Sequence, residues 1–250
     1  LLRHVDSIVN AVEVNNFAGI DLDYESISIS DEVQYFKFLQ LLSEELHAND
    51  KILSVTVLAK WGDGVRYSYR PETRQMQDWS RIGQYADEVR IMAYDYTSSS
   101  DMYPGPIGPT GWIENVLVYA KTKIPPEKTV LGIHLYAYEW YQNAQTGGKL
   151  DVITDINQNS ANNPNVARAY TNNTVQNIIK NNTGESSTFE GENIFFYTKN
   201  NDKTGVLENR ALVYIDKDGV EERIQLASEY NIKGVVFWRL GDEGAILATD

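Results

Sequence analysis

The feature that most constrains the fold is a row of three carboxylates inside an apolar run. Residues 15–28 read NNFAGIDLDYESIS, and the acids Asp21, Asp23 and Glu25 are spaced by two. Side chains two residues apart share one face of a β-strand. The three carboxylates are therefore expected to point one way, while the apolar side chains between them point toward covering helices.

A row of acids limits the kind of sheet that can hold this strand. In an open doubly wound sheet helices cover both faces, and three buried carboxylates would be costly there. In a closed barrel of parallel strands the second face lines the interior, and active sites lie at the C-terminal mouth. We therefore expect the acids to climb out of a barrel interior, with Glu25 nearest the mouth.

The rest of the chain alternates β-rich runs with helical periods, which is typical of βαβ units and a parallel sheet. The predicted strands are FAGIDLDYE, KILSVTVLA, DEVRIMAYDY, KTVLGIHLYAY and KGVVFWRL. The clearest predicted helices are HVDSIVNAVEVNN, DEVQYFKFLQLLSEELHAN, DWSRIGQYA, WIENVLVYAKTK and DGVEERIQLASEYN. The sequence thus predicts the α/β fold class.

The alternation stops in a polar stretch rich in Asn, Gly and Thr. We interpret residues 141–212 as an inserted small subdomain, with a helix near residues 166–181 and a strand at NIFFYTK. Residues 1–140 would form the main barrel portion, and residues 213–250 the last barrel helix and strand.

The composition excludes several classes of partner and of binding site for this chain. The 250 residues are 42% hydrophobic, enough for a sizeable core, and carry a net charge of -13, which argues against a nucleic-acid partner. No apolar run reaches the length of a membrane span. The absence of cysteine excludes disulfides and Cys-based zinc sites. The three histidines show no ligand spacing, so we expect no metal and no cofactor.

Three carboxylates this close cannot all stay ionised cheaply, so the group is expected to share a proton. A protonated Glu beside an ionised Asp is what cleavage of a glycosidic bond requires. Two other interpretations remain open at this point. The acids could hold calcium or magnesium, or they could be a solvated row at a barrel mouth with no chemistry.

The run GIDLDYE resembles the active-site strand of glycoside hydrolase family 18, the chitinase family, whose pattern is D-G-x-D-x-D-x-E. Three more segments resemble family strands in the same order: MAYDY at residues 92–96, LGIHLYAYEW at 131–140 and GVVFWRLGDE at 234–243. PGPIGPTGW and FWRLGDE further resemble the bacterial branch that includes spore-cortex and peptidoglycan-lytic members.

The resemblance implies a (β/α)8 TIM barrel with a small α+β insertion before the last strand. The acid-bearing strand would be the fourth of eight, and residues 51–59, 88–96, 129–138 and 233–240 would form the fifth to eighth. The first three strands are then lacking in this chain. Because five parallel strands leave exposed edges, we expect the sequence to be incomplete at its N-terminus or completed by another segment.

The resemblance also implies catalytic roles. Glu25 would be the general acid that protonates the glycosidic oxygen, while the 2-acetamido oxygen of the substrate attacks the anomeric carbon. Asp23 would orient that acetamido group, and Asp21 would share a proton with Asp23. Tyr94 would donate a hydrogen bond to the acetamido carbonyl.

Further residues are expected to bind the sugar. Asp95 would contact it near the cleavage point, Trp238 would form an apolar floor, and Tyr136 would line the same pocket. Met92 is included with them, although a core position suits it in either case. The remaining candidates are the pair Tyr214 and Asp216.

The sequence departs from the family pattern at several positions. Ala18 replaces the outermost acid, Ser26 follows Glu25, and His134 and Ala137 replace a proline and a glycine. These changes bear on the substrate rather than the reaction, and the presence of Glu25 argues against a pure lectin. Chitin or chitooligosaccharide is the first choice of substrate, peptidoglycan the second and N-glycan cores the third.

Two other classes stay open: a chitinase-like carbohydrate-binding protein without turnover, and a cation-dependent protein that uses the acid row. We expect a monomer that is secreted or associated with a bacterial cell wall, and whose partner is a glycan containing N-acetylglucosamine.

Overall fold

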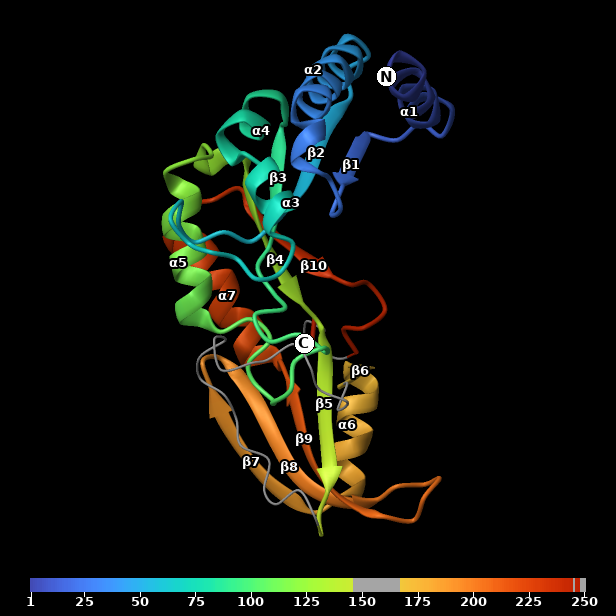
Figure 1. Ribbon diagram of the computed structural model, residues 1–250, viewed down its shortest axis with the longest axis vertical. Coiled ribbons are helices and arrows are strands. Elements are labelled where there is room, and N and C mark those ends of the chain that lie inside the picture. The colour runs from blue at the N-terminus through green and yellow to red at the C-terminus, as the bar shows by residue number, and fades with distance from the viewer. Residues whose placement is uncertain (146–166, 245, 248–250) are drawn as a thin grey trace. The chain divides into compact units, whose positions relative to one another are not determined.

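The computed structural model describes residues 1–145, 167–244 and 246–247, and the chain divides into two compact units (Figure 1). The first comprises Leu1–Met92, Glu114–Gly132 and Ala227–Val236. The second comprises Ala93–Ile113, Ile133–Leu226 and Phe237–Asp250.

A five-stranded sheet contains the acid row. Its strands are β1 (Gly19–Asp23), β2 (Ile52–Leu58), β3 (Glu88–Met92), β4 (Thr129–His134) and β10 (Gly234–Trp238), in the order β1-β2-β3-β4-β10. The pairs from β1 to β4 are parallel. A Cβ atom at Gly19 would lie 2.1 Å from the carbonyl oxygen of Ile52, so only glycine allows these two strands to approach at this point.

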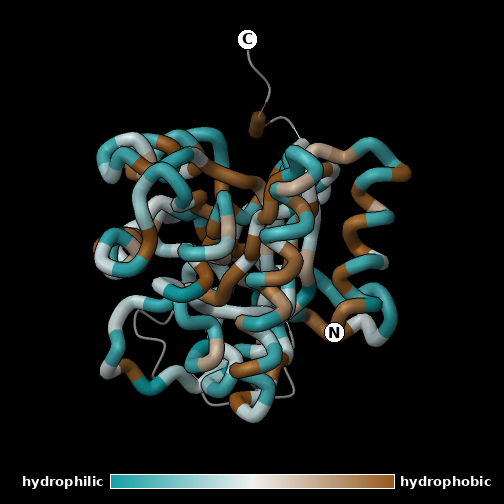
Figure 2. The backbone as a smooth tube through the Cα atoms, turned by 90° about the horizontal axis from the view of Figure 1, so that it is seen from above, coloured by the Kyte–Doolittle hydropathy of each residue, from teal (hydrophilic) through white to brown (hydrophobic). Residues whose placement is uncertain are grey.

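Along the chain, helices precede the strands of this sheet. They are α1 (Leu2–Val14), α2 (Glu32–Ala48), α3 (Pro71–Met76), α4 (Trp79–Tyr85), α5 (Thr110–Lys121) and α7 (Lys217–Glu229), with 3-10 turns at Ile29–Asp31 and Pro126–Lys128. Helix α1 buries Val5, Val9 and Val12, one per turn. Its apolar and polar residues alternate visibly along the tube near the N-terminus in Figure 2.

The second sheet is antiparallel along its β6-β5-β9-β8-β7 order. Its strands are β5 (Tyr136–Asn143), β6 (Arg168–Thr171), β7 (Gly184–Phe189), β8 (Glu192–Asn200) and β9 (Leu207–Tyr214). Helix α6 (Asn172–Asn181) inserts Val175 into a buried cluster with Ala137, Phe195 and Leu212. This unit therefore has a core of its own.

Five predicted strands and the parallel pairing are confirmed, and the arrangement is that of a partial TIM barrel. Some boundaries differ. The strand predicted to end at Glu25 ends at Asp23, and the strand predicted to end at Tyr96 ends at Met92. The run at residues 129–138 contains two strands, because β4 ends at His134 and Tyr136 already pairs with Thr171 in the other sheet. No Gly or Pro stands at Leu135, where the chain changes sheet, so the sequence gives no sign of this break.

The inserted sheet accordingly extends beyond the predicted limits of 141 and 212, since it begins at Tyr136 and ends at Tyr214. The predicted helix near residues 166–181 is the strand β6 followed by α6, and its first residue lies outside the described part. The strand predicted at NIFFYTK is β8.

Candidate active site

Two of the three acids, Asp21 and Asp23, lie on β1 as predicted, and Glu25 lies two residues beyond its end. Leu22 is buried at 4% exposure, while Asp21 and Asp23 on either side of it are exposed. Tyr24 continues the helix-facing side, because its ring stacks on Phe38 of α2 at 6.0 Å and its hydroxyl is 2.7 Å from Nε2 of His4. The alternation of faces thus separates the carboxylates from the helices that cover the sheet.

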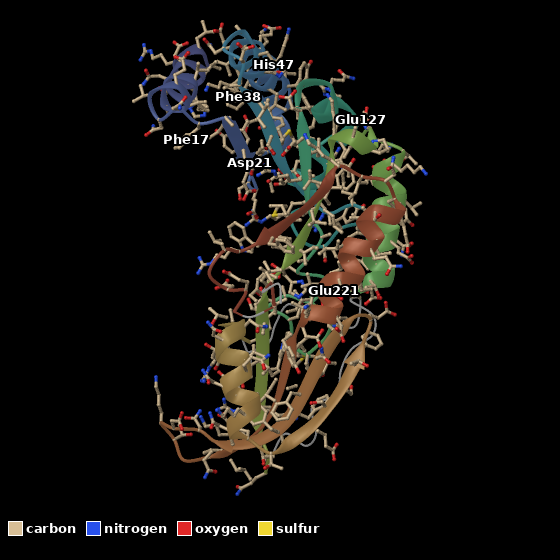
Figure 3. The ribbon with its side chains drawn as sticks, turned by 180° about the vertical axis from the view of Figure 1, so that it is seen from behind. Phe17, Asp21, Phe38, His47, Glu127 and Glu221 are labelled. Carbon is tan, nitrogen blue, oxygen red and sulfur yellow. The ribbon has the colours of Figure 1, made fainter. Side chains whose placement is uncertain are left out.

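Asp21, labelled on β1 in Figure 3, is contacted by side chains of the two neighbouring strands. The hydroxyl of Thr56 on β2 donates to its Oδ2 at 2.8 Å, and Nη1 of Arg90 on β3 lies 3.7 Å from its Oδ1. Its side chain is 31% exposed. A hydroxyl donor and a nearby cation fix this carboxylate at the start of the row.

Asp23 is the last residue of β1, and the pKa of its carboxyl is raised above the usual value. Partial burial is the largest cause, followed by repulsion from Glu25 and Asp21, while the cation Arg70 opposes them. The expected repulsion among the three acids is therefore present, and it raises the pKa of the middle one, Asp23.

Glu25 lies just past the strand end, and α3 and the residue before it hold it there. Nη1 of Arg70 is 3.0 Å from Oε2 of Glu25, and the same guanidinium donates to the Glu25 carbonyl. The hydroxyl of Thr73 lies 3.3 Å from that carbonyl oxygen. The side chain is 36% exposed, so an incoming substrate can reach it.

Met92 ends β3 in the same unit and is partly buried. In the strand register it lies opposite Leu58, the last residue of β2. Met92 therefore lies in the same sheet as the acids of β1, with β2 between them.

A second group of predicted residues forms in the second unit. The hydroxyl of Tyr136 donates to Oδ1 of Asp95 at 2.5 Å, and that of Tyr138 donates to the same oxygen at 2.9 Å. Tyr94 meets Tyr136 edge to face at 6.2 Å. Burial, and then the Asp95 charge, raise the pKa of Tyr136 well above 10, so this phenol stays a proton donor.

Trp238 is the last residue of β10 and is 50% exposed. Its carbonyl accepts a hydrogen bond from the amide of Leu135 at 2.7 Å, which fixes its backbone. A fixed backbone under an exposed indole ring suits a surface on which a sugar stacks.

Tyr214 and Asp216 have contacts of their own. Tyr214 is 9% exposed and packs with Leu212 and Phe195. Asp216 accepts from the amide of Gly219 at 3.0 Å, which caps α7, and from the side chain of Asn193 at 2.7 Å. Their contact with a sugar stays a prediction.

Sequence reasoning missed Arg70, Thr56 and Tyr138. Thr56 had a usable signal, since it lies on the strand next to the acids and pairs with Asp23 in the register. Tyr138 repeats the two-residue spacing of Tyr136 on β5. Arg70 lies in a loop without periodicity, and no sequence signal points to it.

Two tryptophans, one in the loop after β2 and one in α5, pack on tyrosines. Trp61 meets Tyr67 edge to face at 4.8 Å, and Trp112, which is 8% exposed, packs on Tyr96 at 5.3 Å.

Among the described residues, no cluster of three or more His, Asp or Glu is arranged to hold a metal ion. Within the same residues, no helix has the length and apolar character needed to cross a membrane.

Comparison with known proteins adds to this geometry. A profile of the family described as glycosyl hydrolases family 18 matches residues 3–243. The chain is 26% identical over 243 residues to YvbX of Bacillus subtilis (strain 168), described as an uncharacterized glycosylase. The matched region covers 96% of this chain and 62% of that protein.

A cortical fragment-lytic enzyme of Bacillus anthracis is 25% identical over 240 residues, which cover 96% of this chain and 50% of that enzyme. The chain therefore spans about half to three fifths of the length of these relatives. Among solved structures, a chitinase from Chromobacterium violaceum has the same fold, with a TM-score of 0.78, 23% identity, and coverage of 97% of this chain and 67% of that one.

Proposed function

Because this chain belongs to glycosyl hydrolases family 18, we propose that it is a retaining glycosidase that hydrolyses β-1,4 bonds of glycans containing N-acetylglucosamine. The observation that carries the proposal is the acid row, in which a reachable Glu25 follows Asp23 at the end of β1. Both the order and the spacing of these acids suit substrate-assisted cleavage.

In the proposed reaction Glu25 donates a proton to the glycosidic oxygen as the bond to the anomeric carbon breaks. The acetamido oxygen of the substrate attacks that carbon and forms an oxazolinium ion. Glu25 then takes a proton from the incoming water, which opens the ion with net retention. The proton that Glu25 gives to the leaving group in the first step is replaced in the second step by one from water.

The other acids act on the acetamido group. Asp23 orients it and stabilises the positive charge of the oxazolinium ion, and its raised pKa suits a carboxyl that shares a proton with Asp21. Tyr94 donates to the acetamido carbonyl, Asp95 and Tyr136 hold the sugar near the cleavage point, and Trp238 forms the floor beneath it.

Chitin or chitooligosaccharide remains the first choice of substrate. Peptidoglycan is the second candidate, and it is favoured by the likeness to the cortical fragment-lytic enzyme of Bacillus anthracis. N-glycan cores are third. We also propose that the protein acts as a monomer, and that it is secreted or associated with a cell wall, where such glycans are found.

The test is to incubate the protein with chitooligosaccharides and with peptidoglycan, and to follow new reducing ends and binding in parallel. New ends from the oligosaccharides support the first choice, and ends from peptidoglycan alone support the second. Binding to either glycan with no new ends from any substrate would replace the glycosidase with a carbohydrate-binding protein.

A further inference from the structure

Helix α3 holds the segment that carries Glu25 through the backbone. The hydroxyl of Thr73 lies 3.3 Å from the Glu25 carbonyl oxygen and 3.4 Å from both the amide nitrogen and the carbonyl oxygen of Ile27. Arg70, immediately before the helix, adds its bonds to the carbonyl and the carboxylate of Glu25. The start and middle of α3 therefore fix the residues on either side of the acid.

Gln77, the residue directly after α3, holds the same segment at Tyr24, one residue before Glu25. Nε2 of Gln77 donates to the Tyr24 carbonyl at 3.2 Å, and its Oε1 accepts from the amide of Leu58 at 2.8 Å. Gln77 is 1% exposed, so these bonds are shielded from water. Contacts from both ends of α3 thus converge on residues 24–27.

A helix of six residues is too short to be stable by itself. Its carbonyls at the C-terminal end lack partners within the helix. Here the ammonium of Lys60 provides the missing hydrogen-bond donor. Its Nζ donates to the carbonyl of Arg74 at 3.1 Å and to that of Gln77 at 2.6 Å. A cation is also favoured at this end by the helix dipole.

Burial of the Lys60 ammonium removes water from it and so disfavours its charged form. Lys60 is 8% exposed, and burial lowers its pKa to about 8. Asp78 and Asp63 face it and oppose that shift, whereas Lys123 and Arg74 add to it. Both hydrogen bonds described for its Nζ go to carbonyls at the end of α3, those of Arg74 and Gln77.

We propose that α3 is a clamp that positions Glu25 for proton transfer, and that Lys60 is a positioning residue that holds the clamp by its C-terminal carbonyls. The catalytic consequence rests on the proposed function, whereas the clamp itself does not. The hydrogen bonds of Lys60 go to the end of α3 and not to Glu25, and its Nζ also lies 5.5 Å from the ring centroid of Trp79, the first residue of α4.

The test compares Lys60→Met with a matched control, Lys128→Met. The ammonium of Lys128 donates to the carbonyls of Gly83 and Ala86, at 2.9 and 2.8 Å, and so caps the end of α4 in the same manner. Among the described hydrogen bonds, none joins residues 79–85 to residues 24–27. The two variants therefore lose the same kind of bond, but only one is linked to the acid.

The first readout is hydrolysis. Displacing a catalytic group by a fraction of an ångström to one ångström costs up to about a hundredfold in rate. We expect kcat of Lys60→Met to fall by about ten- to a hundredfold with KM nearly unchanged, and kcat of Lys128→Met to stay within about twofold of the parent. A parallel loss in both variants would overturn the proposal.

The second readout is amide hydrogen exchange of residues 24–28, which needs no substrate. Exchange is expected to speed up in Lys60→Met and not in Lys128→Met. If the parent hydrolyses no glycan, the proposed function fails, yet this readout still decides the clamp. If exchange in Lys60→Met equals that of the parent, the clamp is wrong even where hydrolysis is found.

Rescue separates positioning from a general loss of folding. Because the chain has no cysteine, Lys60→Cys can be alkylated at that residue alone with 2-bromoethylamine in denaturant and then refolded, which restores an ammonium of nearly the original length. Activity and exchange should return toward the parent, whereas the unmodified variant taken through the same steps should not recover.

Thr73→Val, which removes the hydroxyl next to Glu25, is a second variant and should also speed up exchange of residues 24–28. Failure of both the rescue and Thr73→Val would overturn the clamp.

Discussion

The guanidinium of Arg70 lies 3.0 Å from the carboxylate of Glu25. Arg70 reaches it from a left-handed backbone conformation, with φ of 47° just before α3. Its charge also acts on Asp23, whose pKa it lowers against the effects of burial and of the neighbouring acids. One arginine thus connects the end of the acid row to the helix that holds it.

Replacing Arg70 with Met should raise the pKa of Asp23 further, because the one opposing cation is removed while burial and the two acids remain. Carbon-13 NMR of the carboxyl groups across a pH titration measures this directly. Arg66→Met is the control, since Arg66 is an exposed arginine of the same loop and is not among the groups that shift Asp23. An Asp23 titration that is the same in parent and Arg70→Met contradicts the prediction.

A buried ion pair should dominate the stability of the second unit. Nη2 of Arg223 is 3.1 Å from Oε1 of Glu192, both side chains are fully buried, and the carboxylate also accepts from the amides of Ile107 and Gly108. Arg223→Met leaves the carboxylate without its cation, and we expect a loss of about 3–5 kcal/mol in the free energy of unfolding.

Urea unfolding measures that loss. Arg81→Met is the control, because it breaks the partly exposed pair with Glu32 and should cost at most about 1 kcal/mol. Adding Glu192→Gln to Arg223→Met should recover part of the stability, since the unpaired charge is then gone. Equal losses for the two single arginine variants would show that the buried pair has no special weight.

The buried His134 should make the protein less stable in mild acid. Burial, and then the charge of Arg223, hold its pKa well below 6.5, so the folded protein keeps it neutral while the unfolded chain takes up a proton. As the pH falls below 6.5, the unfolded state binds more protons and the free energy of unfolding decreases. Relative to His134→Gln, the parent should lose stability between pH 7 and pH 5; a constant difference argues against a neutral buried imidazole.

Lys60 should give a dependence of the same sign in alkali, with stability rising as the pH rises. Its pKa of about 8 in the folded protein lies below the ordinary 10.5, so between these values the unfolded chain binds the proton and the folded protein does not. The parent should therefore gain stability relative to Lys60→Met as the pH rises through this window, by an amount on the order of 3 kcal/mol at most. Chemical unfolding at pH 7 and pH 10 measures the difference, and a difference that does not change with pH rules out a desolvated ammonium.

Much of this architecture follows from the sequence, because period-two and helical patterns are local signals. The acid row on β1, the burial of Leu22 between its acids and the alternation of strands and helices all follow from that periodicity. The break after His134 does not, since a continuous β-forming run gives no sign of a change of sheet.

The residues that hold the acids were beyond sequence reasoning for a different reason. Arg70 and Lys60 lie in the loop between β2 and α3, or at its edge, where no periodic pattern fixes the direction of a side chain. Apart from the Glu25 carboxylate, their hydrogen-bond partners are backbone carbonyls, which every residue has, so the sequence carries little complementary signal. Such contacts become visible only once the chain path is known.

The most direct measurement is hydrolysis of a fluorogenic chitotrioside by the parent, by Glu25→Gln and by Glu32→Gln. Glu32 is the matched control, because it is a glutamate of the same unit that also pairs with an arginine, Arg81, at 2.5 Å. Loss of a positioned proton donor is worth about two to four decades in rate, so Glu25→Gln should fall by at least about a hundredfold while Glu32→Gln stays near the parent. Equal rates for the parent and Glu25→Gln would contradict the assignment of Glu25 as the general acid.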